Sequence, residues 1–200
     1  PVSADDFAAP TSRGQPLSVM ADWDFRQPPE DWSNILPDTF QSWGDGVNPL
    51  LTDWVSHAEV DDPAQWTWDA GDGDGQVSPT LNQPFTIKLA NFLDTKSTKL
   101  VSIHITYSGG LWPGVPEVKG YDNPPGGAHL NEGAAEFLGP NYLDYSVRIV
   151  GNPAFEVIKI DVPSGICVDR IVVDTISCPE PATLSLLALG GLAVLRRRRK

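Results

Sequence analysis

Short stretches in which apolar and polar residues alternate, separated by turns rich in glycine and proline, constrain the fold of this chain more than any other feature. Alternation with a period of two puts every second side chain on one face, as in a half-buried β-strand. The stretch 17–25, LSVMADWDF, has an apolar residue at every odd position. With 18 glycines and 19 prolines in 200 residues, the chain favours many strands joined by turns over a helical bundle.

The same alternation predicts further strands at residues 51–60, 65–69, 84–93, 99–107, 117–121, 145–150, 154–162 and 166–177. The connection DTKST between 84–93 and 99–107 has hairpin length, so these two strands are expected to pair. The turn PSG joins 154–162 to 166–177, and these two strands are expected to form the clearest hairpin of the chain. One helical turn is expected at 133–139, GAAEFLG.

Eight to ten strands without a long helix before residue 182 predict an all-β fold. We expect an antiparallel β-sandwich of jelly-roll type, with two sheets about 10 Å apart. An immunoglobulin-like sandwich is the alternative, but the Cys–Trp–Cys pattern of that family is absent. The sandwich is expected to span residues 17–177, after a flexible polar leader at 1–16 and with loops at 26–50 and 70–83.

The charge of the chain is unevenly distributed. The net charge is −12, and because residues 196–200 contribute +5, residues 1–195 carry −17. An acidic body repels a phosphate backbone, so nucleic-acid binding is not expected. A soluble acidic surface fits an extracellular or ion-rich setting instead.

The chain ends with an apolar segment and an unbroken basic block. Residues 182–195 carry no charge and as a helix span about 21 Å, against about 30 Å for a bilayer core. The segment is short for a permanent span, although local thinning of the bilayer and snorkelling of basic side chains allow insertion. A buried C-terminal helix is the alternative, but such a helix is normally amphipathic. On insertion, a block of five residues stays on the cytoplasmic side: Arg196, Arg197, Arg198, Arg199 and Lys200.

The tripeptide Pro179, Glu180 and Pro181, followed by the apolar segment and the basic block, resembles the PEP-CTERM sorting signal. The same signal has also been labelled the C-terminal domain of ice-binding proteins, and the resemblance covers residues 178–200. It implies recognition by exosortase, an intramembrane transpeptidase-like enzyme of Gram-negative bacteria, and cleavage near the tripeptide. It also implies a precursor held transiently in the inner membrane through residues 182–195. The body is then released or transferred to the cell surface or the extracellular matrix.

The body is expected to have a structural, adhesive or binding role at the cell surface or in extracellular polysaccharide, without catalysis. A carbohydrate-binding module is the alternative, with Trp32, Trp43 and Trp112 as candidate stacking residues because they lie in loop-like sequence. Trp66 and Trp68 share one face of a predicted strand and are expected in the core. A glycan-active enzyme comes third, because no GxSxG, HExxH or Cys–His arrangement occurs and the sequence cannot place two flanking carboxylates.

Three aspartates in WDAGDGDGQ are candidate ligands for Ca²⁺, namely Asp69, Asp72 and Asp74. Asp–Gly alternation lets carboxylates converge on a hard cation while glycine permits a tight backbone. The glycine and glutamate that an EF-hand loop requires are missing, so a plain acidic turn is the alternative. The chain's three histidines show no metal-ligand spacing: His57, His104 and His129.

The two cysteines, Cys167 and Cys178, are not expected to bridge to each other. The ten residues between them are predicted to form a strand, which puts its ends roughly 30 Å apart. A disulfide needs Cα atoms within about 7 Å. No export signal is visible from Pro1 onward, so the N-terminus is interpreted as that of a fragment or a processed product.

Overall fold

The structure is a computed structural model that describes residues 13–43, 56–70, 75–90, 98–112, 114–121, 129, 131–151 and 153–178. Within these ranges the chain forms twelve β-strands and one short 3-10 helix, Pro63–Gln65. The strands are β1 (Ser18–Trp23), β2 (Thr39–Trp43), β3 (His57–Val60), β4 (Trp66–Asp69), β5 (Gln76–Pro79), β6 (Gln83–Ala90), β7 (Thr98–Ser108), β8 (Glu117–Tyr121), β9 (Asn131–Leu138), β10 (Tyr142–Val150), β11 (Phe155–Val162) and β12 (Cys167–Cys178).

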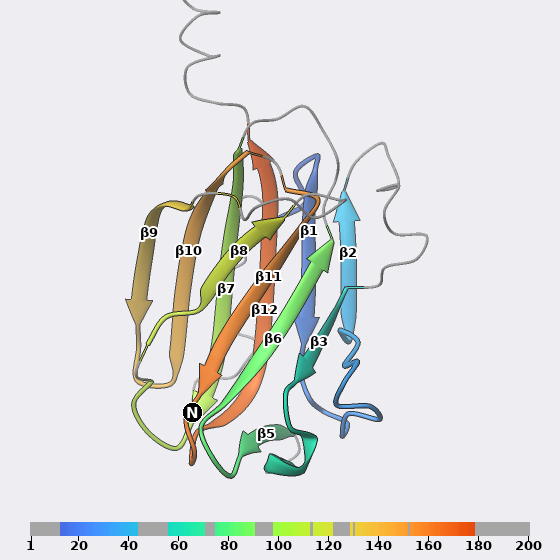
Figure 1. The fold of residues 1–200 in the computed structure, drawn as a ribbon, viewed down its shortest axis with the longest axis vertical. Helices are drawn as coiled ribbons and strands as arrows, with labels where there is room; N and C mark the ends of the chain where they lie inside the picture. The colour runs from blue at the N-terminus through green and yellow to red at the C-terminus, as the bar shows by residue number, and fades with distance from the viewer. Residues whose placement is uncertain are drawn as a thin grey trace, which may run out of the picture.

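The strands form two antiparallel sheets packed face to face (Figure 1). The larger sheet has the order β2-β1-β12-β7-β10-β9, with β5 also paired to β12 and β4 paired to β5. The smaller sheet has the order β3-β6-β11-β8. Most connections cross from one sheet to the other, as in a jelly roll. The predicted antiparallel β-sandwich is therefore confirmed.

Both hairpins expected from the sequence are wrong. β6 pairs with β3 and β11 in the smaller sheet, whereas β7 lies in the larger sheet between β12 and β10. In the same way β11 lies in the smaller sheet, whereas β12 lies in the larger one between β1 and β7. A connection of hairpin length also suffices to cross between two sheets about 10 Å apart. The alternation within each strand is the same in both arrangements, because each strand buries one face either way.

Three strands are missing from the sequence-based prediction, because pairing with a neighbour rather than their own pattern defines them. β9 pairs with β10, so the helical turn expected at 133–139 is wrong. β2 lies within the loop expected at 26–50 and pairs with β1 as an edge strand. β5 lies within the loop expected at 70–83 and pairs with β4 and β12. Strand formation depends strongly on such neighbours and only weakly on intrinsic preference.

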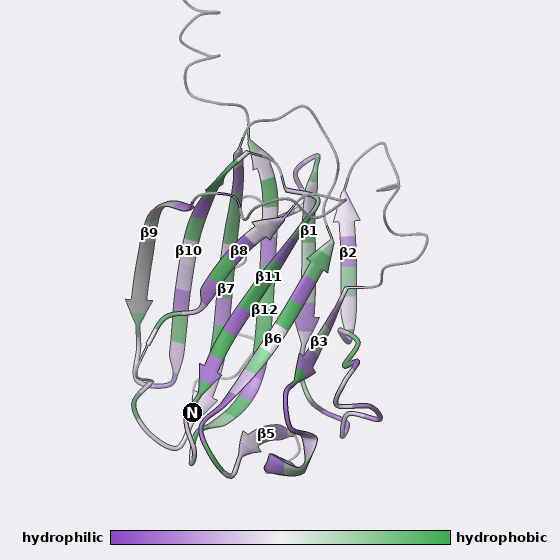
Figure 2. Ribbon diagram, viewed as in Figure 1, coloured by the Kyte–Doolittle hydropathy of each residue, from purple (hydrophilic) through white to green (hydrophobic). Residues whose placement is uncertain are grey.

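The core lies between the sheets and is built from the inward side chains of both. Figure 2 shows the alternation as green and purple bands along β6 and β11. In β1 the odd-numbered residues Val19, Ala21 and Trp23 are buried in the core, as the sequence predicted. The indole Nε1 of Trp23 donates to the carbonyl oxygen of Ile35 at 3.0 Å, which ties the segment before β2 to the core.

Two charged side chains are also fully buried inside the sandwich, one from each sheet. Lys99 of β7 lies opposite Ile149 of β10, and Glu156 of β11 lies opposite Gly120 of β8. Gly120 and Ile149 are neighbours, because a Cβ atom on Gly120 would lie 3.1 Å from Cγ2 of Ile149. Lys99 and Glu156 therefore face the same part of the core with opposite charge.

Candidate functional site

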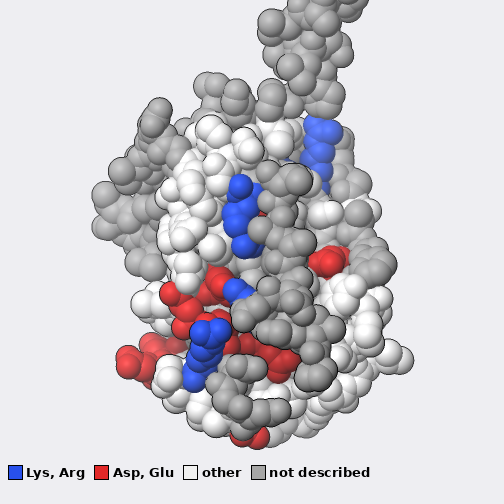
Figure 3. Space-filling view, turned by 180° about the vertical axis from the view of Figure 1, so that it is seen from behind, with Lys and Arg blue, Asp and Glu red and all other residues white. Residues whose placement is uncertain are grey.

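The outward face of the larger sheet carries charged contacts between segments that are far apart in the sequence. The register places Asp22 of β1, Val172 of β12, His104 of β7 and Asp144 of β10 in one row across this face. Although these side chains point away from the core, Val172 is 1% exposed and Asp22 and His104 are each 8% exposed. Figure 3, seen from behind, shows acidic and basic side chains close together on this face. Polar groups with so little access to water need partners within the protein.

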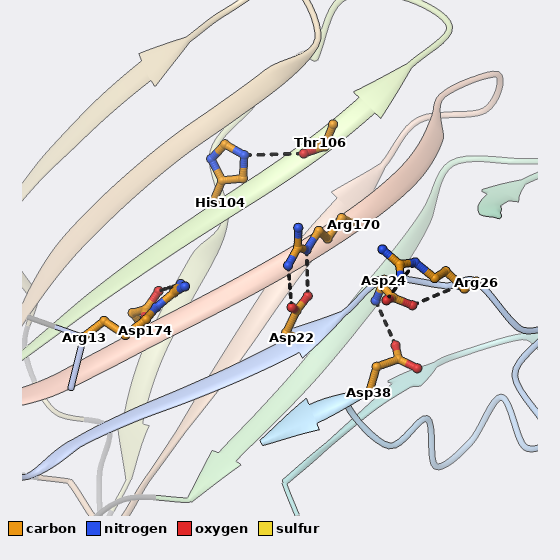
Figure 4. Close-up of polar contacts among 9 residues, drawn as sticks. All are labelled: Arg13, Asp22, Asp24, Arg26, Asp38, His104, Thr106, Arg170 and Asp174. Carbon is orange, nitrogen blue, oxygen red and sulfur yellow. Dashed lines mark hydrogen bonds and ion pairs between the residues drawn. The ribbon is translucent and has the colours of Figure 1, made fainter. Parts of the chain in front are cut away.

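Two arginine–aspartate pairs join distant segments on this face (Figure 4). Arg170 donates through Nε and Nη2 to the two carboxylate oxygens of Asp22, at 2.9 and 2.7 Å. Arg13 donates in the same way to Asp174, at 2.8 and 2.6 Å. Such bidentate pairs fix the orientation of both groups. Sequence reasoning missed them because the partners lie 148 and 161 residues apart.

A further acidic group lies where β1 ends and β2 begins (Figure 4). The backbone N–H of Asp24 donates to Oδ2 of Asp38 at 2.8 Å, and Nε of Arg26 lies 3.2 Å from Oδ2 of Asp24. Asp38 is an exposed residue, but partial burial of its carboxyl group raises the pKa of that group. The hydrogen bond from Asp24 opposes this rise in pKa, whereas the negative charges of Asp24 and Asp22 add to it.

Replacing Asp38 by Asn is expected to raise the midpoint of thermal unfolding slightly at pH 7 and to leave it unchanged near pH 4. A carboxyl group whose pKa is raised by folding stabilises the protein below its unfolded pKa of roughly 4, and this contribution is lost as the pH rises through the folded pKa. Asn keeps an oxygen that accepts from Asp24 but carries no charge. Circular dichroism melts at both pH values check this, and a lower midpoint at pH 7 contradicts it.

His104 lies between a carboxylate and a hydroxyl group on the same face. Its Nδ1 is 2.5 Å from Oδ1 of Asp144, its Nε2 is 3.4 Å from Oγ1 of Thr106, and the ring of Tyr142 stacks on it. The order carboxylate, imidazole, hydroxyl is that of a nucleophile activated by a base. Activation needs the hydroxyl and the base within about 2.6–3.2 Å. The Nε2–Oγ1 distance of 3.4 Å is longer than this range, and the contact between His104 and Asp144 joins β7 to β10.

The predicted calcium ligands lie partly outside the described residues. Asp69 ends β4, whereas Asp72 and Asp74 fall in the gap at 71–74. Within the described ranges no group of three or more His, Cys, Asp or Glu side chains is arranged to hold a metal ion. The calcium-stabilised loop stays a prediction, because two of its three ligands lie in that gap.

The structure separates the three tryptophans that the sequence suggested as a stacking surface. Trp112 lies outside the strands, as its loop-like sequence predicted, but it is only 4% exposed and packs on Tyr107, which leaves little of its ring accessible for stacking. Trp32 is partly buried and packs on Trp66, with ring centroids 6.1 Å apart. Trp43 is the last residue of β2, at the opposite end of the larger sheet from Trp112. The three side chains therefore do not form one platform.

The two tryptophans of β4 point to one side of their strand, as the sequence predicted. Trp66 is buried in the core and packs on Phe85, with ring centroids 5.8 Å apart. Trp68 is partly buried against the core, and its Nε1 donates to the carbonyl oxygen of Phe25 at 2.7 Å. Thr67, between them, is exposed. These aromatic rings therefore stabilise one end of the sandwich.

The last strand leads directly into the predicted sorting tail. β12 forms over the residues where a strand was predicted, and both cysteines, at its two ends, are free. Its pairing with β7 continues to the end, where the hydroxyl of Thr98 donates to the carbonyl oxygen of Cys178 at 3.0 Å. The described part of the chain contains no helix long and apolar enough to cross a membrane. The tail from 179 to 200, with the tripeptide and the basic block, lies outside that part.

A β-sandwich followed at once by an apolar and then a basic terminus defines a body with a C-terminal sorting segment. A family model described as the PEP-CTERM protein-sorting motif matches residues 177–200, so the chain ends in a segment similar to a PEP-CTERM sorting signal. Such a signal marks an exported surface protein, targeted by exosortase and made as a membrane-anchored precursor. No curated protein and no solved structure matches the chain. The match therefore concerns the sorting signal at the C-terminal end and does not describe the activity of the body.

Proposed function

We propose that this chain is a structural or adhesive protein of the cell surface or extracellular matrix. The observation that carries the proposal is the sorting motif at 177–200, which begins within the last two residues of β12, the final strand of the sandwich. β12 ends at Cys178 and the tripeptide begins at the next residue. Cleavage near the tripeptide therefore takes no described strand from the body.

In this proposal the tail acts in three parts. Residues 182–195 hold the precursor in the inner membrane for a limited time, because a helix of fourteen uncharged residues is short against a bilayer core of about 30 Å. The basic block at 196–200 keeps the end of the chain on the cytoplasmic side. Exosortase then cuts near the tripeptide, and the body reaches the cell surface.

A structural or adhesive role requires a body with a stable fold, and several contacts stabilise this one. Bidentate pairs from Arg170 to Asp22 and from Arg13 to Asp174 tie β12 to β1 and to the segment before it. The buried core between the two sheets supports a stable unit. We assign no catalytic role to the body and propose extracellular polysaccharide as its surroundings.

Protein recovered from its native envelope is expected to lack the basic block at 196–200, because processing removes the tail. A variant with Pro179, Glu180 and Pro181 replaced by alanine is expected to keep it. Intact-mass spectrometry distinguishes the two forms, and circular dichroism controls that the variant body folds like the parent. Mature parent protein that still carries residues 196–200 overturns the proposed processing.

A further inference from the structure

The outward faces of the two sheets differ in exposure. On the larger sheet, outward residues of the central strands β1 and β12 such as Met20, Val172 and Asp174 are buried, whereas those of β10 are half-buried and β2 is exposed. On the smaller sheet, the outward residues of β3, β6, β8 and β11 are half-buried or exposed, with Ala90 as the exception. The smaller sheet, in front in Figure 1, therefore offers accessible outward side chains along all four of its strands.

Tyr121, at the end of β8, and Phe155, at the start of β11, form an aromatic pair on this open face. The two residues lie opposite each other in the sheet, with ring centroids 5.5 Å apart and ring planes inclined by 21°. Their neighbours Gly120 and Glu156 are buried, so both rings point outward, and both rings are half-buried. Cross-strand aromatic pairs stabilise a sheet. Such a pair on an open face also offers aromatic surface to a ligand.

Donors and acceptors surround the aromatic pair on the same face. Lys88 and Lys119 flank Val157 in one row across β6, β11 and β8. Each lysine has a carboxylate beside it, Glu59 at 2.8 Å from Lys88 and Glu117 at 2.6 Å from Lys119. The ion pair of Lys119 is exposed and that of Lys88 is half-buried. Ion pairs close to the surface contribute little to stability, so their groups can also bind a ligand. The face thus combines aromatic surface with charged groups of both signs.

We propose that this face binds an uncharged polysaccharide, with sugar rings packed on Tyr121 and Phe155. A chain of sugars carries hydroxyl groups that both donate and accept, which matches ammonium donors beside carboxylate acceptors. A polyanion meets the two carboxylates and a protein of net charge −12, which disfavours it. The inference rests on the proposed function, because it names the chemistry of a polysaccharide contact at the cell surface. The proposed stacking residues are thus Tyr121 and Phe155 on the smaller sheet, in place of the tryptophans that the sequence suggested.

Affinity electrophoresis of the full chain in detergent tests the inference, with hydroxyethyl cellulose and galactomannan as uncharged polymers and alginate as the anionic comparison. An uncharged polymer is expected to retard the parent protein. Tyr121→Ala and Phe155→Ala are each expected to raise the Kd at least about tenfold, as loss of an aromatic contact does. Lys119→Ala is a second kind of variant, because an exposed side chain is lost while the sheet stays intact. We expect it to weaken binding several-fold.

Tyr142→Ala is the matched control. Tyr142 is also a half-buried, outward tyrosine with a stacked partner, His104, but it lies on the larger sheet. Its substitution is expected to leave the retardation unchanged, and circular dichroism verifies that every variant folds. The inference is overturned if neither uncharged polymer retards the parent protein, or if only alginate does. It is also overturned if Tyr142→Ala reduces the retardation as much as the substitutions of Tyr121 and Phe155 do. If the native protein lacks residues 196–200 but binds neither uncharged polymer, only this inference is overturned. If the native protein keeps residues 196–200 but binds an uncharged polymer, only the proposed processing by exosortase is overturned.

Discussion

A chain that ends at Cys178 is expected to unfold at the same temperature as the full chain, whereas a chain that ends at Asp169 is expected not to fold. The longer form keeps all of β12, which pairs with β1, β7 and β5. The shorter form loses the fully buried side chains of Ile171, Val172 and Val173. At about 1.5–3 kcal/mol for each, this loss approaches the 5–15 kcal/mol that typically stabilises a domain.

Circular dichroism melts of the three chains, all in the same detergent, check this expectation. A cooperative transition in the chain that ends at Asp169 contradicts the central role of β12. A midpoint several degrees lower in the chain that ends at Cys178 shows instead that the tail stabilises the body. The expected result means that exosortase acts on a tail whose removal costs the body no stability. Processing and folding are then independent events.

Replacing Lys99 by Met alone, or Glu156 by Met alone, is expected to lower the free energy of unfolding by about 3–5 kcal/mol. Each substitution removes one of two opposite charges that face the same part of the core and leaves the other buried. The double substitution is expected to restore most of the loss, because apolar residues of similar volume replace a buried ion pair at little or no cost. Urea unfolding of the four proteins measures the difference.

Lys88→Met is the control for this cycle. Lys88 lies 2.8 Å from Glu59 but on the open face, where an ion pair contributes about 0–1 kcal/mol. Its substitution is therefore expected to change stability little. A double variant as unstable as the sum of the two single losses contradicts the view that Lys99 and Glu156 compensate each other. The result bears on the fold, because the two residues come from different sheets and the Lys99 ammonium donates to Oγ of Ser177, near the end of β12, at 3.4 Å.

The strands themselves were largely predictable, because the period of two is a local property. Residues 154–162 and 166–177 were predicted as strands and form β11 and β12 almost within those bounds. Their pairing was not predictable, because a strand with one apolar face fits either sheet of a sandwich equally well. The same limit explains β2, β5 and β9, which pairing with their neighbours defines.

The candidate sites were less predictable than the strands. Trp112 was a candidate stacking residue because it lies in loop-like sequence, but its side chain is buried against Tyr107. The open pair Tyr121 and Phe155 gave no sequence signal, since each is one aromatic residue at the end of a strand and they lie 34 residues apart in the chain. The one available hint was their position in the alternation, on the side of each strand opposite to the core.

The sequence by itself determined the class of fold and the presence of a C-terminal sorting signal. Both depend on patterns contiguous in the chain, the alternation along each strand and the order of tripeptide, apolar segment and basic block at 179–200. Only the tertiary structure decided which strands share a sheet, which arginine pairs with which aspartate, and which outward side chains stay accessible to solvent. These depend on packing between segments up to 161 residues apart, where burial and charge are settled by residues that no local pattern connects.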